Sequence, residues 1–168
     1  MTVGATGMLS PALDWVAARS ARTVVVARRA SRWSPSATPA GPVVPLDGDW
    51  RDGDALTAAL GQAIDPGEVN LLLLWIHASG SQALQGLLDL FAPRDLLIVH
   101  VLSSAAGDPA AYRDAVSRRG TGARYRTVKL GAVRGAVGWR WLSDAEISEG
   151  AIQAIRAQQD VTVGEIPG

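Results

Sequence analysis

The sequence predicts an α/β domain in which a mainly parallel sheet of about six to seven strands has helices on both faces. Short apolar runs alternate with amphipathic helical patterns along the whole chain. Two of these runs, Leu71–Ile76 and Leu96–Leu102, are apolar at every position except His100. Continuous apolar strands are typical of parallel sheets, because helices cover both of their faces. The length of 168 residues suits one domain, which we expect to span residues 1–168.

The first quarter of the chain predicts a helix, a strand and a loop. Pro11 suits the first turn of a helix and Ser10 can cap it, so a helix is expected over Ser10–Ser20. The β-branched run Thr23–Ala27 predicts a buried strand. Ser31–Pro42 is rich in serine, proline and alanine and predicts an exposed loop.

The rest of the chain continues the alternation. Asp108 and Pro109 match a helix cap followed by a first-turn proline, and Ser143 with Glu146 fits a capping box. The expected strands are Val43–Leu46, Leu71–Ile76, Leu96–Leu102, Tyr125–Leu130 and Val161–Val163, and the expected helices are Asp54–Ile64, Gln82–Phe91, Asp108–Arg119 and Ser143–Gln158. Parallel strands end at one edge of a sheet, where such domains bind their ligands.

The composition excludes several classes of function. The chain has no cysteine, which rules out disulfide scaffolds, thiolate nucleophiles and iron–sulfur or zinc–cysteine sites. Two histidines make a poor metal site, so we predict no metal. A net charge of zero argues against nucleic acid as a partner. No apolar run reaches the ~20 residues of a membrane helix and the start lacks a signal-peptide pattern, so we expect a soluble, cytoplasmic protein.

A glycine-containing loop joins the first apolar residues to the first expected helix. Glycines at such a turn let the backbone approach a pyrophosphate, while the helix N-terminus offers free N–H groups and a positive dipole end. The loop is therefore a candidate cofactor-binding segment. Its residues are Gly4, Ala5, Thr6, Gly7, Met8 and Leu9.

An arginine cluster without a neighbouring acid follows the second expected strand. In dinucleotide-binding domains an acid at this place binds the ribose of NAD, whereas an arginine accommodates the 2′-phosphate of NADP. Guanidinium groups match phosphate in geometry and charge. We therefore expect Arg28, Arg29 and Arg32 to favour NADP(H) over NAD(H). The alternative is a solvated run of charge.

These segments resemble the short-chain dehydrogenase/reductase superfamily, specifically its small, atypical members. The resemblance rests on GATGML at Gly4–Leu9, VVVARR at Val24–Arg29, the stretch Leu46–Trp50 and the segment Leu130–Val133. It covers nearly the whole chain and implies a Rossmann-like, doubly wound fold. It also implies an oxidoreductase that transfers hydride between NADP(H) and a small carbonyl compound or activated alkene.

The resemblance implies an adenine contact after the third strand. In the superfamily an acidic residue makes this contact, and the backbone of its neighbour helps. Asp49 with Trp50 matches best by spacing, and Asp47 is the alternative. A plain turn acid is the other interpretation.

The resemblance also implies contacts nearer the nicotinamide. Ile76 and His77 stand where the family has an Asn-Ala-Gly turn beneath the cofactor. Gly131 and Val133 stand in the segment that flanks the nicotinamide, with Leu130 in place of the family's proline.

The catalytic pattern of the family is incomplete in this sequence. Ser103 and Ser104 end the fifth strand, where the family has a serine, and Tyr112 lies on the following helix. Val116 replaces the lysine that the family places four residues after its tyrosine, and a tyrosine without that lysine is a poor base at neutral pH. His77 is the candidate substitute, because histidine exchanges protons near neutrality.

The candidate catalytic residues are therefore Ser103, Ser104, His77 and Tyr112. Structural roles in packing or hydrogen bonding are the alternative for Tyr112, His77 and His100. If their strands are neighbours, the two histidine rings are expected near each other.

Other features leave further alternatives open. Only Met1–Val3 precede the glycine loop, so the first strand is either stunted or continues upstream. Trp15 and Trp75 fit core patterns, and Lys129 lies within an expected strand without a catalytic role. Core packing is the default interpretation of Trp139 and Trp141, and the alternatives are an aromatic wall for a flat ligand or an oligomer contact.

The sequence thus favours an NADP(H)-binding oxidoreductase with an unknown small-molecule substrate. One alternative is a nucleotide-binding sensor that lost the tyrosine–lysine pair. Another is a degenerate domain that binds no nucleotide. A homo-oligomer is compatible with all three.

Overall fold

The computed structural model describes residues 1–120, 122–135 and 138–166. Seven strands form one sheet in the order β3-β2-β1-β4-β5-β6-β9, and every pair in it is parallel. The strand order reverses direction between β1 and β4, which is the topological switch point of a Rossmann-like, doubly wound fold. The predicted fold class is confirmed.

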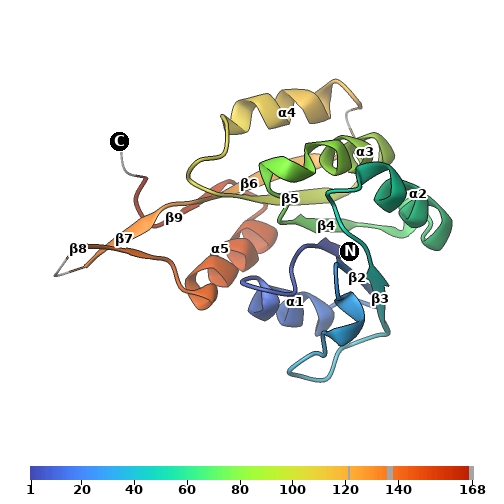
Figure 1. Cartoon of the computed structure of the whole chain (residues 1–168), viewed down its shortest axis with the longest axis horizontal. Coiled ribbons are helices and arrows are strands. Elements are labelled where there is room, and N and C mark those ends of the chain that lie inside the picture. The colour runs from blue at the N-terminus through green and yellow to red at the C-terminus, as the bar shows by residue number, and fades with distance from the viewer. Residues whose placement is uncertain (121, 136–137, 167–168) are drawn as a thin grey trace.

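Helices and strands alternate along most of the chain (Figure 1). The sheet strands are β1 (Thr2–Val3), β2 (Thr23–Ala27), β3 (Val43–Asp47), β4 (Leu71–Leu74), β5 (Leu97–Leu102), β6 (Arg124–Leu130) and β9 (Val161–Val163). The helices are α1 (Ser10–Ala17), α2 (Gly53–Ala63), α3 (Ser81–Phe91), α4 (Pro109–Ser117) and α5 (Asp144–Ala157), with short 3-10 turns η1 (Ala30–Arg32), η2 (Pro66–Glu68) and η3 (Ala78–Gly80). None of the helices described is both long and apolar enough to cross a membrane.

The sheet is the middle of three layers. Figure 1 shows α2, α3 and α4 on one face and α1 and α5 on the other. Side chains of β4 alternate between the two cores: Leu72 and Leu74 join the α2–α4 side, and Leu73 joins the α1–α5 side. All three are fully buried, which is why the strand reads as a continuous apolar run.

The first strand is short but central. Thr2 pairs with Val25 of β2 and Leu73 of β4, and Val3 pairs with the next residue of each strand. The pairing continues past the strand, because the Trp75 amide donates to the Val3 carbonyl at 2.9 Å. β1 therefore brings the glycine loop to the switch point.

Several predicted signals are confirmed. Ser143 caps α5, and the Ser143 amide donates a hydrogen bond to the Glu146 carboxylate, which completes the capping box. Asp108 caps α4 through the Ala110 amide at 2.8 Å. Pro45 lies in the edge strand β3. A proline is tolerated in an edge strand because the N–H that it lacks would face solvent and not a neighbouring strand.

The cap of α1 differs from the prediction. Leu9 occupies the cap position and Ser10 is already the first helical residue. The Ser10 hydroxyl instead accepts a hydrogen bond from the Trp33 indole N–H at 2.9 Å. The helix ends at Ala17, three residues before the predicted end at Ser20.

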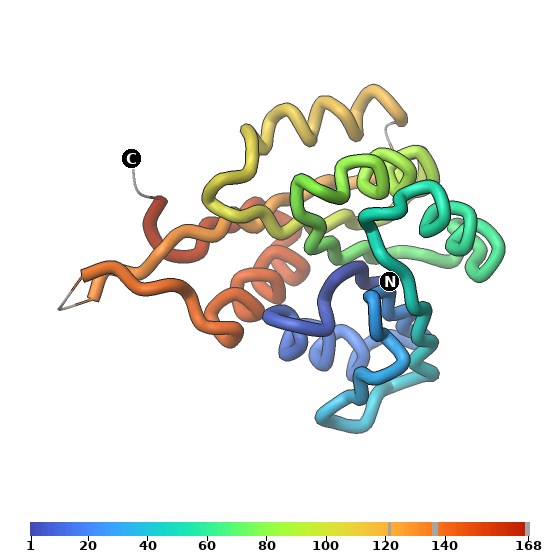
Figure 2. The backbone as a smooth tube through the Cα atoms, in the orientation of Figure 1, coloured from blue at the N-terminus to red at the C-terminus, as the bar shows by residue number. Residues whose placement is uncertain are grey.

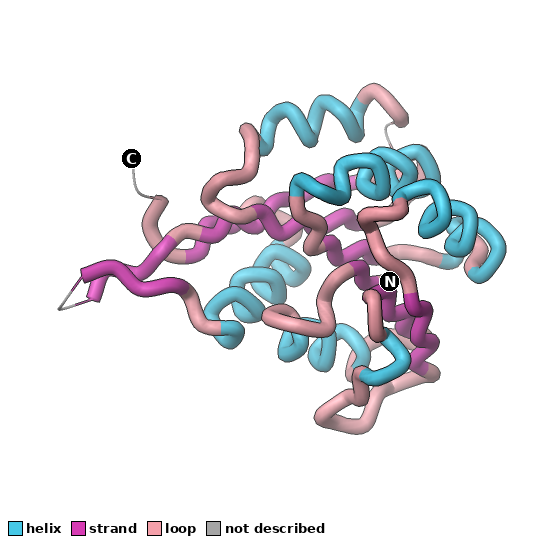
Figure 3. Tube along the Cα trace, in the orientation of Figure 1, coloured by secondary structure: helices cyan, strands magenta, loops and turns pink. Residues whose placement is uncertain are grey.

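A two-stranded antiparallel ribbon was not predicted. It consists of β7 (Ala132–Gly135) and β8 (Gly138–Trp141). Figure 2 shows it projecting from the body of the molecule, and Figure 3 shows that strand structure continues into it from the main sheet. Its strands are short, exposed and rich in glycine and arginine, so their sequence lacks the apolar alternation that signals a strand.

Candidate functional site

Three neighbouring cavities line the carboxyl edge of the sheet. The largest, the arginine cavity, has a volume of about 650 Å³ and is lined by Gly4, Thr6, Gly7, Met8, Ala27, Arg28, Arg29, Trp50, Trp75 and His77. The apolar cavity, of about 370 Å³, is lined by Met8, Trp75, Ser103, Ser104, Ala105, Leu130, Gly131, Trp141, Leu142 and Ile147. The histidine cavity, of about 330 Å³, is lined by Trp75, Ile76, His77, Ala78, Ser79, Leu102, Ser103, Ala105, Ala106, Gly107 and Tyr112.

The glycine loop forms one wall of the arginine cavity. Gly4 has a φ of 77°, and a Cβ there would lie 2.2 Å from the Trp75 carbonyl oxygen, so the position requires glycine. Gly7 is different, because a Cβ there would meet nothing within 4 Å. The backbone at Gly7 is therefore open to the cavity and leaves room for a ligand to approach closely.

The loop is held in place from behind. Ala5 and Leu9 are fully buried, so these two predicted contacts anchor the loop rather than line the cavity. Ser148 of α5 donates to the Met8 carbonyl at 3.2 Å. Helix α1 has no capping side chain and no acid in its first turn among the residues described. Its N-terminus thus keeps its positive character toward the loop.

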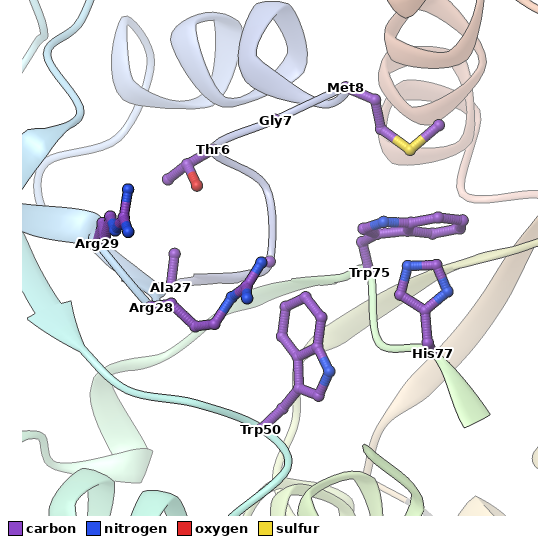
Figure 4. Close-up of a pocket in the computed structure, with 10 residues that line it drawn as sticks. Thr6, Gly7, Met8, Ala27, Arg28, Arg29, Trp50, Trp75 and His77 are labelled. Carbon is purple, nitrogen blue, oxygen red and sulfur yellow. The ribbon is translucent and has the colours of Figure 1, made fainter. Parts of the chain in front are cut away.

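Arg28 and Arg29 leave the end of β2 and enter the same cavity (Figure 4). Both are exposed, and neither side chain forms a hydrogen bond or an ion pair with another residue in the described part of the chain. Their charge is therefore available to an anion. Arg32, the third predicted arginine, ends η1 and does not line the cavity.

The two acids considered for the adenine contact are both engaged locally. Asp47 accepts hydrogen bonds from the Ser31 amide and hydroxyl, which hold the pKa of Asp47 below its ordinary value. The Arg51 guanidinium bonds to Asp49 and lowers its pKa to about 2. Neither carboxylate lines the arginine cavity, whereas Trp50 does.

Trp75 is the residue that sequence reasoning missed. It was expected in the core, but β4 ends at Leu74, so Trp75 lies beyond the strand, half-buried. It lines all three cavities. Its ring meets the His77 ring edge-on with centroids 4.7 Å apart, and Trp50 lies 6.2 Å from His77 (Figure 4). The predicted strand was two residues too long, so the position of Trp75 at the edge of the cavities was not predicted.

The histidine cavity brings together three of the four candidate catalytic residues, His77, Ser103 and Tyr112. Ser104, the fourth, lines the apolar cavity, which Ser103 also lines. Ile76, a predicted cofactor contact, is buried and lies in the wall of the histidine cavity.

Lys129 fixes the loop that carries the two serines. Its Nζ donates to the Ala106 carbonyl at 2.7 Å, and the Ala106 amide donates to the Ser103 carbonyl at 3.0 Å. Ser103 and Ala105 line both smaller cavities, so this loop lies where the two cavities meet. Lys129 is therefore placed to position the loop from β6.

The two histidines have different surroundings. His100 lies inside β5, 1% exposed, with its Nδ1 2.7 Å from the Tyr125 hydroxyl and its ring 5.3 Å from that of Tyr112. Burial lowers the pKa of His100 to about 4, and the nearby Ile76 backbone opposes that shift in part. Burial also raises the pKa of Tyr125. β4 and β5 are neighbours, as expected. The two histidine rings nevertheless have different partners: His77 is exposed and its ring contacts Trp75, whereas the His100 ring lies against tyrosines.

The apolar cavity lies toward the ribbon. Gly131 lines it, and a Cβ there would lie 2.1 Å from the Glu165 carbonyl oxygen. Val133 faces Arg140 across the ribbon and is not part of the lining. Trp141 does line the cavity although it is 80% exposed.

The ribbon is fastened to the start of α5. Arg140 binds both carboxylate oxygens of Glu146, at 2.8 and 2.9 Å. Together with the Ser143 hydrogen bonds, this ion pair lowers the pKa of Glu146. The ion pair holds β8 against the start of α5, next to the apolar cavity that Trp141 lines.

Within the described residues, no group of three or more histidine, aspartate or glutamate side chains could hold a metal ion. Comparisons of the chain with models of known protein families and with curated proteins gave no match.

Proposed function

We propose that this protein binds NADP(H) along the carboxyl edge of its sheet and acts as an oxidoreductase similar to short-chain dehydrogenases. The observation that carries the proposal is the arginine cavity. There, two arginines that form no hydrogen bond or ion pair in the described part of the chain lie in one cavity with an open glycine loop, next to the N-terminus of α1, which has no capping side chain. This combination suits a ligand with phosphates at two places.

The residues of the arginine cavity fit the phosphates of the cofactor. The open backbone at Gly7 and the N-terminus of α1 suit the pyrophosphate. Arg28 and Arg29, at the end of β2, suit the 2′-phosphate of the adenosine ribose. Trp50 offers an aromatic face to the adenine.

The nicotinamide end of the cofactor suits the apolar cavity. Met8 and Trp75 line both this cavity and the arginine cavity, so an elongated ligand can pass from one to the other. The apolar lining, with no charged residue among those described, matches an uncharged dihydronicotinamide ring. The bound cofactor would supply or accept hydride.

The chain's own residues orient the acceptor and supply a proton. Ser103 lies between the two smaller cavities, where its hydroxyl can donate to an acceptor oxygen. His77 shares the histidine cavity and is exposed, so it can renew its proton from water. Tyr112 completes the wall of the histidine cavity. One helical turn later stands buried Val116, where the family has a lysine.

The buried Val116 also favours a second candidate function. A domain that kept the cofactor site but lost the activated tyrosine would act as a nucleotide-binding regulator. The two candidates differ in turnover: the regulator binds NADPH but oxidises it with no carbonyl or alkene acceptor.

The experiment compares variants by calorimetric titration. Replacing both arginines (Arg28→Ala with Arg29→Ala) should weaken NADPH binding at least a hundredfold, since each of the two lost charge-assisted hydrogen bonds contributes about 1.5–3 kcal/mol. NADH binding should change less than threefold. Arg118→Ala removes another exposed arginine, at the C-cap of α4 and outside the cavity lining, and is the matched control. Equal losses for both nucleotides would contradict the 2′-phosphate assignment.

A further inference from the structure

The histidine cavity differs from the arginine cavity in charge and in volume, which is about 330 Å³ against about 650 Å³. Among its described lining residues there is no aspartate, glutamate, lysine or arginine. Three of its walls are aromatic, formed by Trp75, His77 and Tyr112. Its polar groups are hydroxyls, such as that of Ser103, together with the His77 imidazole.

This lining selects a small, neutral, planar ligand. None of the lining residues described carries a charge that could pair with an anionic or cationic acceptor, so this lining favours a neutral one. Aromatic walls favour a ligand that has ring faces and edges of its own. The volume of about 330 Å³ lies at the lower limit of small-molecule sites, which suits a single ring.

Proton supply narrows the ligand further. Reduction of an aldehyde or ketone forms an alkoxide, whose conjugate acid is about as weak an acid as water. Such a step needs a strong proton donor. Tyr112 lacks an activating cation on its own helix face, because buried Val116 stands one turn away. The ammonium of Lys129 donates to the Ala106 carbonyl instead. Reduction of a quinone instead forms a phenolate, whose conjugate acid has a pKa of about 10, like tyrosine.

We propose that the acceptor in the histidine cavity is a small, neutral, monocyclic quinone. This inference rests on the proposed NADP(H) function. One quinone, one NADPH and one proton give one hydroquinone and one NADP⁺. The quinone is reduced by the two electrons that arrive as hydride, and the one proton that completes the hydroquinone comes from water through His77.

Gly107 allows the cavity to be tested without disturbing the fold. It lines the histidine cavity, and a Cβ there would meet no atom within 4 Å, so Gly107→Leu fills space rather than creating a clash. Gly61 on α2 is the matched control, because a Cβ there also meets nothing within 4 Å and the residue lines none of the three cavities. The lack of cysteine keeps quinone probes from forming thiol adducts with the chain.

The assay follows NADPH oxidation with 2,6-dimethyl-1,4-benzoquinone. We expect kcat/KM for this quinone to be at least tenfold above that for benzaldehyde, which tests the requirement for a quinone. It should also be at least tenfold above that for a sulfonated benzoquinone, which tests the requirement for a neutral ligand. Gly107→Leu should raise the quinone KM about tenfold while NADPH Kd stays within twofold. Gly61→Leu should change neither. Equal or better reduction of benzaldehyde or of the sulfonate, or an unchanged KM in Gly107→Leu, overturns the inference.

A second readout does not depend on turnover. Calorimetry with 2,6-dimethylhydroquinone and the protein alone should show binding that Gly107→Leu weakens about tenfold and Gly61→Leu preserves. If NADPH fails to bind, the proposed function is wrong, and this titration still decides whether the cavity accepts the ring. Absence of hydroquinone binding, or equal binding by both variants and the wild type, contradicts the quinone site.

Discussion

The arginine cavity and the histidine cavity differ in charge more than in construction. The arginine cavity draws most of its wall from two short contiguous segments, Gly4–Met8 and Ala27–Arg29, and presents two exposed guanidinium groups. The histidine cavity likewise draws most of its wall from two short segments, residues 75–79 and 102–107, but it presents neutral aromatic and hydroxyl groups. The glycine loop and the arginines are signals that can be recognised in the local sequence, so we call the arginine cavity the local end of the site. The neutral groups of the histidine cavity come together only when the fold places β4, β5 and α4 side by side, so we call it the assembled end.

The largest expected effect tests the local end. Gly4→Val should cost about 4 kcal/mol of unfolding free energy and abolish NADPH binding, because the position has a φ of 77° and its Cβ would clash with the Trp75 backbone. Denaturant unfolding and calorimetry measure both quantities.

Gly7→Ala sharpens the same test. Its Cβ meets nothing within 4 Å, so the variant should unfold like the wild type and still bind NADPH more weakly, by filling space intended for the cofactor. If Gly7→Ala binds NADPH normally, the open backbone at Gly7 does not mark a ligand site.

The next effect concerns the residue behind the histidine cavity. His100 is buried with a pKa of about 4, while its ordinary value of 6.5 applies to the unfolded chain. The unfolded state therefore takes up the proton first as the pH falls. Stability should be complete above pH 6.5 and decline toward pH 4, by about 3 kcal/mol in total at about 1.4 kcal/mol for each pH unit.

Urea unfolding at a series of pH values measures this dependence. His100→Gln keeps a hydrogen-bonding group beside Tyr125 but does not titrate, so its stability should vary much less between pH 6.5 and 4. An equally steep decline in the variant would show that other groups cause it.

The smallest effect concerns the Ser103 loop, which lines both the apolar and the histidine cavity. Lys129→Met removes the hydrogen bond to the Ala106 carbonyl and should cost about 1 kcal/mol of stability. The NADPH Kd should stay within twofold, while the acceptor KM rises several-fold because the Ser103 loop loses its anchor. Lys129→Arg keeps a donor and should restore part of the loss. A change in NADPH Kd instead would mean that the two ends of the site are not separate.

The sequence predicted the fold and the local end of the site for the same reason. Continuous apolar strands and capping signals such as Ser143 with Glu146 depend on neighbouring residues, so they can be recognised without tertiary contacts. The glycine loop and the arginines at the end of β2 are signals of the same kind. Within that loop, however, sequence alone did not separate exposed Gly7 from fully buried Leu9.

The assembled end was predicted less completely. Trp75 packs partly against the α1–α5 core, as its place in the apolar run of β4 suggests, but it also lines the cavities because it lies at the carboxyl end of that strand. The role of Lys129 depends on a hydrogen bond to a residue 23 positions away. The ribbon of β7 and β8 is held by tertiary contacts such as Arg140 with Glu146, which its own sequence does not reveal.

The central claim is that the arginine cavity binds the 2′-phosphate of NADP(H). Calorimetric titration of the wild-type protein with NADPH and, separately, with NADH tests it most directly. We predict NADPH binding at least tenfold tighter than NADH binding. Equal affinity for the two nucleotides would contradict the role of Arg28 and Arg29, and binding of neither would contradict the cofactor site itself.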